Sequence, residues 1–121
     1  MSRIQTIDHR GRQVILLDFS GISLPSEWTA AVAEARRFFS ALPADGSALT
    51  LTDVSGTRYN RDTVESMKAL TVANEPYVRV GAVVNTSVMH RAVIGMIALF
   101  ARRRFEVFET RDQALDWLVA Q

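Results

Sequence analysis

The sequence predicts a single α/β domain over residues 1–121, with an N-terminal β-hairpin followed by four β/α units. Two observations predict this class. Apolar, β-branched runs of strand length alternate with longer segments in which apolar residues recur every three or four positions. No repeat, low-complexity segment or linker divides the chain. Strands that alternate with helices form parallel sheets with right-handed crossovers, so we expect a mostly parallel sheet with an antiparallel edge strand.

The first elements are a hairpin and a helix. Residues 4–7 and 14–19 are apolar runs of strand length that flank a polar turn at residues 9–12, which is the spacing of an antiparallel hairpin. A helix is expected next, with Ser26 as its cap and one apolar stripe over residues 28–42.

Three further strand–helix units follow from the same patterns. A capping-box sequence at residues 110–113 begins the last helix, and the apolar end of the third run is typical of a covered parallel strand. The expected strands are residues 48–54, 77–84 and 105–108, and the expected helices are residues 60–74, 88–101 and 110–119.

Composition excludes several kinds of chemistry. There is no cysteine, which removes disulfides, thiolate metal sites and cysteine nucleophiles, and two histidines are too few for a multi-histidine site. Lys and Arg number 14 against 13 Asp and Glu, so the net charge of +1 provides no field for nucleic acid. We therefore expect no metal, no cofactor and no nucleic-acid partner. The N-terminal residues resemble no signal peptide, and we expect a cytoplasmic protein.

Several strings carry a resemblance that covers most of the chain: residues 14–21, 51–56, 59–60, 74–78, 82–84 and 108–118. In this order and spacing they resemble the SpoIIAA-like family, which comprises the STAS domains (sulphate transporter and anti-sigma-factor antagonist) and a stand-alone bacterial branch related to the CRAL-TRIO lipid-binding fold. The resemblance implies a SpoIIAA-like fold and a non-enzymatic regulatory or protein-interaction module.

The same resemblance locates a phosphorylation position. In the anti-sigma-factor antagonists, a serine at the start of one helix is phosphorylated by a partner kinase. In this sequence Asp62 falls on that serine, with Thr63 beside it. An aspartate has a permanent negative charge, so we expect that the chain lacks the kinase switch.

Loops that follow parallel strands converge at one edge of the sheet, where ligands of such folds bind. A candidate site for a partner or ligand therefore lies after the strand at residues 48–54. We call it the recognition edge, and it comprises Ser55, Thr57, Tyr59, Asn60, Asp62 and Thr63. One interpretation is helix capping by Asn60 or Asp62, and the other is a polar surface for an anion or a partner protein.

The helix expected at residues 88–100 is too apolar for a surface helix. It is buried in the monomer, forms a homodimer interface, or covers a pocket for a small apolar, lipid-like ligand, and we expect the chain to form a homodimer. The residues expected at this interface or pocket are Met89, Val93, Met96, Ile97 and Phe100. Three arginines at residues 102–104 complement the helix dipole or allow at most peripheral membrane contact.

Catalysis has little basis in the sequence. Asp18 and Asp53 end adjacent predicted strands and could together serve acid–base chemistry or hold a cation, but loop hydrogen bonding explains them more simply. His9 and His90 have no triad pattern around them, and we interpret both as structural. We therefore expect no enzyme. The predicted function is a regulatory or protein-interaction module, and the alternative is a carrier or sensor of a small apolar ligand.

Overall fold

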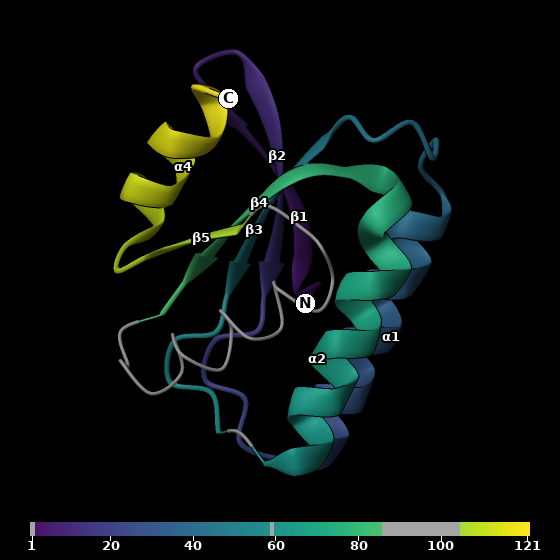
Figure 1. Ribbon diagram of the computed structural model, residues 1–121. Coiled ribbons are helices and arrows are strands. Elements are labelled where there is room, and N and C mark those ends of the chain that lie inside the picture. Colours follow the sequence, from purple (N-terminus) through teal and green to yellow (C-terminus); the bar gives the residue numbers. More distant parts are fainter. Residues whose placement is uncertain (1, 59, 86–104) are drawn as a thin grey trace.

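The described part of the protein forms a five-stranded mixed sheet with helices on both faces (Figure 1). The computed structural model describes residues 2–58, 60–85 and 105–121. The strands lie side by side in chain order, and their bounds are β1 (Ile4–His9), β2 (Arg12–Asp18), β3 (Ala48–Asp53), β4 (Val78–Val84) and β5 (Phe105–Phe108). Strands β1 and β2 are antiparallel and every other neighbouring pair is parallel, which confirms the predicted sheet.

The β1–β2 hairpin turns over two residues, fewer than the polar run at residues 9–12 indicates. Arg10 and Gly11 both have positive φ, at 52° and 80°. Positive φ at both central residues is the requirement of a type I′ turn, whose twist matches that of the flanking strands. Arg10 thus adopts a backbone conformation that only glycine adopts without strain.

The described helices are α1 (Pro25–Ser40), α2 (Arg61–Asn74), the short 3₁₀ helix η1 (Glu75–Tyr77) and α4 (Arg111–Val119). Helix α1 corrects one expectation, because Leu24 rather than Ser26 occupies its N-cap position. The carboxylate of Glu27 accepts the Leu24 N–H at 3.3 Å in place of a capping side chain. The helix predicted at residues 88–101 lies outside the described residues. No helix in the described part of the chain is long and apolar enough to cross a membrane.

The two faces of the sheet bury separate apolar cores. Helices α1 and α2 lie together on one face, and α4 covers the other (Figure 1). Side chains alternate between these cores along the strands, since a strand presents successive residues to opposite faces, and the irregular pairing between Val78 and Val80 of β4 is an exception. Leu17, Phe19, Trp28 and Phe39 belong to the core under α1 and α2. Val14, Leu16, Leu51 and Leu118 belong to the core under α4.

Candidate functional site

The recognition edge lies at the carboxyl end of the sheet, where the loop after β3 is hydrogen-bonded to the loop after β2. Hydrogen bonds join the two loops into one surface. Each loop turns through a glycine with positive φ, Gly21 at 68° and Gly56 at 69°. The joining bonds run from Gly21 N to Ser55 O at 2.9 Å, from Arg58 N to Ile22 O at 3.0 Å, and from Thr57 Oγ1 to Phe19 O.

An ion-pair cluster lies at the ends of β2 and β3, where the two loops begin. Asp18 and Asp53 are neighbours at the ends of β2 and β3, as the sequence indicates, and Arg111 of α4 lies against both. Its Nε is 2.7 Å from Asp53 Oδ2, and its Nη2 is 3.2 Å from Asp18 Oδ1. The cation beside the two carboxylates is therefore a side chain of the protein itself.

Both carboxylates also accept hydrogen bonds from backbone N–H groups of the loops. Asp18 Oδ1 accepts the Ser20 N–H at 3.2 Å, and Asp53 Oδ1 accepts the Ser55 N–H at 2.9 Å. Burial raises the pKa of Asp18, but the hydrogen bonds from Ser20 and the charge of Arg111 outweigh it and leave that pKa below its ordinary value. A carboxylate held ionised in this way is poorly matched to proton transfer near neutral pH.

The first turn of α2 combines capping with exposed polar groups. Asn60 is the N-cap, since its Oδ1 accepts the Thr63 N–H at 2.9 Å while Thr63 Oγ1 accepts the Asn60 N–H at 2.8 Å. Thr57 and Thr63 are buried, with 2% and 7% of their surface exposed. Asn60 and Asp62 are exposed and Ser55 is half-buried. Tyr59 lies outside the described residues.

A groove beside this turn adds residues that the sequence analysis did not identify. We call it the loop groove; it has a volume of about 250 Å³ and is lined by Ile22, Ser23, Leu24, Pro25, Trp28, Arg58, Asn60 and Thr63. Leu24 is 58% exposed, which is unusual for a large apolar side chain. Arg58 is exposed and has no carboxylate partner in the described part of the chain. No sequence signal marked this groove, because the pattern favours Ser26 as the cap and the N-cap position of Leu24 is seen only in the structure.

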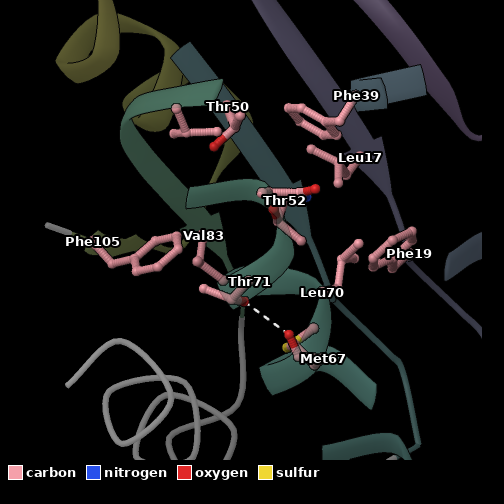
Figure 2. A pocket seen from close by; sticks show the side chains of 12 residues that line it. Leu17, Phe19, Phe39, Thr50, Thr52, Met67, Leu70, Thr71, Val83 and Phe105 are labelled. Carbon is pink, nitrogen blue, oxygen red and sulfur yellow. Dashed lines mark hydrogen bonds between the residues drawn. The ribbon is translucent and has the colours of Figure 1, made fainter. Parts of the chain in front are cut away.

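A second hollow lies between the sheet and α2, and we call it the sheet–helix pocket. Its volume is about 40 Å³. In Figure 2, Leu17, Phe19 and Phe39 lie along one side of it and Phe105 lies on the opposite side. The other lining residues are Thr50, Thr52, Met67, Leu70, Thr71, Asn74, Val78 and Val83. The apolar interface or pocket predicted at Met89, Val93, Met96, Ile97 and Phe100 lies outside the described residues, as does the predicted homodimer contact there.

The remaining polar candidate is His9, which links the hairpin to α4. Its Nε2 is 2.9 Å from Asp116 Oδ1, and Arg10 Nη2 lies 3.3 Å from the same oxygen. This contact agrees with a structural interpretation of His9, whereas His90 lies outside the described residues. Within residues 2–58, 60–85 and 105–121, no group of three or more His, Asp or Glu could hold a metal ion.

Comparison with known proteins identifies the fold. No protein-family model and no curated protein matches the chain. The structure is similar to the crystal structure of an uncharacterized protein of the DUF3478 family from Shewanella loihica PV-4, which has a SpoIIAA-like fold. The TM-score is 0.75 at 13% sequence identity, over 95% of this chain and 91% of that one. The predicted SpoIIAA-like fold is therefore confirmed.

Proposed function

From the SpoIIAA-like fold and the geometry of its recognition edge, we propose that this chain is a non-catalytic, regulatory protein-interaction module. Its partner binds across the exposed part of the recognition edge and the adjoining loop groove. One observation carries this proposal: the groove presents an exposed apolar side chain, Leu24, together with an exposed cation, Arg58, that has no carboxylate partner among the described residues. The complementary partner segment has an apolar residue flanked by acidic ones.

The ion-pair cluster supports a binding role rather than a catalytic one. Asp18 and Asp53 were the best candidates for acid–base chemistry, and both are paired with Arg111 and hydrogen-bonded to the loops. Their effect is to hold the loop backbone in place. A preformed surface loses less conformational entropy when a partner binds, which favours affinity.

The start of α2 supports a module without a phosphorylation switch. Asp62 is exposed but has no hydroxyl, and the hydroxyl of Thr63 is buried and bonded to the Asn60 backbone. A kinase requires an accessible hydroxyl. The start of α2 is therefore proposed to lack the hydroxyl that such a switch needs.

A comparative pull-down tests the proposal. Leu24→Glu and Arg58→Glu change the groove without removing the Asn60–Thr63 cap. Val72→Glu is the matched control, because Val72 is the other exposed large apolar residue in the described part of the chain, at 51%, and lies near the far end of α2. We expect a partner that the wild type and Val72→Glu capture equally and that both groove variants lose. Equal recovery with all four proteins would exclude the loop groove as the binding surface.

Binding of a small apolar ligand is a second candidate, and the sheet–helix pocket favours it. Eight of its twelve described lining residues are apolar: Leu17, Phe19, Phe39, Met67, Leu70, Val78, Val83 and Phe105. Its lining resembles that of ligand sites, in which a few polar groups are placed among apolar walls, but its volume of about 40 Å³ is well below the roughly 300–1,000 Å³ that is usual for such sites.

A further inference from the structure

Strand β1 forms one edge of the sheet, and its outer side carries backbone groups that face away from β2. Among the described strands it pairs with β2 alone. Successive residues of an antiparallel strand alternate between bonding to the neighbouring strand and pointing outward. The Asp18 N–H bonds to the Arg3 carbonyl oxygen at 2.8 Å, so Arg3 and every second residue after it face β2. Ile4, Thr6 and Asp8 therefore direct their N–H and C=O groups outward.

The N-terminal end of this outer side is already covered. Ser2 Oγ accepts the Ile4 N–H at 3.2 Å and lies 2.8 Å from the Ile4 carbonyl oxygen. Thr6 and Asp8 have no such cover, since both residues are exposed and their outward backbone groups have no hydrogen-bond partner among the described residues. The free part of the edge is therefore short and consists of the N–H and C=O groups of Thr6 and Asp8.

A groove beside this free edge lies under the C-terminal end of α1, and we call it the edge groove. Its volume is about 220 Å³, and no charged side chain is among its described lining residues. Its walls include Thr6, Gln13, Ile15, Phe38, Leu42 and Tyr77. Phe38, Leu42 and Tyr77 are only half-buried, so their apolar surface is open to solvent. Because a cavity of about 150 Å³ holds benzene, the edge groove has room for an aliphatic side chain.

The free edge and the edge groove together specify what fits them. An extended segment that adds to β1 in the antiparallel direction bonds directly to Thr6 and Asp8, and antiparallel pairing is the more stable kind. Residues opposite each other on paired strands share a face of the sheet. Thr6 lines the edge groove, so the partner residue opposite Thr6 lies beside that groove and is best apolar. Asp8 is exposed and has no ion pair among the described residues, so a lysine or arginine complements it from the opposite position.

A second copy of this chain fits the edge poorly. In a two-fold antiparallel pairing of β1 with itself, Asp8 lies opposite Ile4, Thr6 or Asp8 of the other copy. Ile4 is covered by Ser2, Thr6 has no charge, and two aspartates repel each other. Self-pairing therefore leaves Asp8 without a cation, and a segment of a different protein is the better partner.

We propose that the free edge of β1 binds an extended, basic segment of another protein by antiparallel strand addition. A lysine or arginine of that segment lies opposite Asp8, and an apolar side chain enters the edge groove. This surface lies at the C-terminal end of α1, whereas the loop groove lies at its N-terminal end. It is therefore a second interaction surface, and its test does not depend on the loop groove.

Titration followed by ¹H–¹⁵N NMR tests the proposal on the full chain, with the acetylated and amidated peptide Thr-Thr-Lys-Val-Leu-Thr-Thr as the probe. Saturable binding is expected, with slower hydrogen exchange at the amides of Thr6 and Asp8 and little change at Gln5, whose amide faces β2. A peptide with Glu in place of Lys should bind about fivefold more weakly, and Asp8→Lys should reverse this preference. Asp112→Lys is the matched control, because Asp112 is an exposed residue of α4 on the opposite face of the sheet, and it should keep the wild-type preference.

Backbone methylation of the peptide separates strand addition from charge attraction alone. Methylating the N atoms of its lysine and leucine removes the donors that face β1 and should abolish binding, whereas methylating the valine N atom, which points away from β1, should not. Equal binding of these two methylated peptides, equal binding of the Lys and Glu peptides by the wild type, or no binding at all would overturn the proposal. A dimer in sedimentation that protects the Thr6 and Asp8 amides would overturn it in favour of a second copy.

Discussion

Removing the cation of the ion-pair cluster should destabilise the protein clearly. Arg111→Met keeps much of the side-chain length but leaves the Asp53 carboxylate, whose side chain is only 8% exposed, without its partner at 2.7 Å. Breaking a fully buried pair costs about 3–5 kcal/mol. The Arg111 side chain is 40% exposed and that of Asp18 is 32% exposed, so solvent screens part of the interaction. We therefore expect a loss of about 2 kcal/mol, which corresponds to a fall in Tm of about 8 °C for a chain of this length.

The assay is urea denaturation at pH 7, with Arg79→Met as the matched control. Arg79 is an exposed β4 residue for which no ion pair exists among the described residues, and its replacement should change the free energy of unfolding by less than about 0.5 kcal/mol. An Arg111→Met variant within about 0.5 kcal/mol of the wild type would refute the argument that this arginine stabilises the recognition edge.

Three other changes test the local physics. Gly81→Ala would place a Cβ 2.5 Å from the Cε1 atom of the Phe105 ring, so it should cost about 1–3 kcal/mol in thermal denaturation, and Phe105→Leu should recover part of that loss; an unchanged Tm would contradict this packing. Asn60→Ala should cost about 1 kcal/mol through the lost N-cap, whereas Asp62→Ala should cost less than half as much; equal losses in urea unfolding would argue against the cap. Because the pKa of Asp18 is lowered in the folded state, this group stabilises the protein above about pH 4, and the contribution is lost as pH falls through the lowered pKa. In acid titrations below that pH, the wild type should lose stability more steeply than Asp18→Asn, and parallel curves would be the opposing result.

Most of the fold follows from local patterns. The hairpin, the strands and the described helices are visible as runs and periodicities within a few neighbouring residues, and the order of elements then favours parallel pairing. The start of α1 was predicted wrongly. Ser26 is a good cap by residue type, but Pro25 occupies the first helical position, so the N-cap position falls on Leu24.

The site was predictable only in outline. Convergence of Asp18 and Asp53 follows from sheet topology, since both end neighbouring parallel strands. Their partner Arg111 lies 58 positions from Asp53 and reaches it only because α4 packs across β3 and β4, which no local pattern records. The loop groove likewise depends on how two loops meet.

Photo-crosslinking in living cells shows directly whether a partner binds at the loop groove, with a photoreactive amino acid placed at position 24 in the groove and, for comparison, at position 72 on α2. We expect a discrete crosslinked partner from position 24, abolished by Arg58→Glu, and no such partner from position 72. The same adducts from both positions, or an adduct from position 24 that Arg58→Glu leaves unchanged, would contradict it.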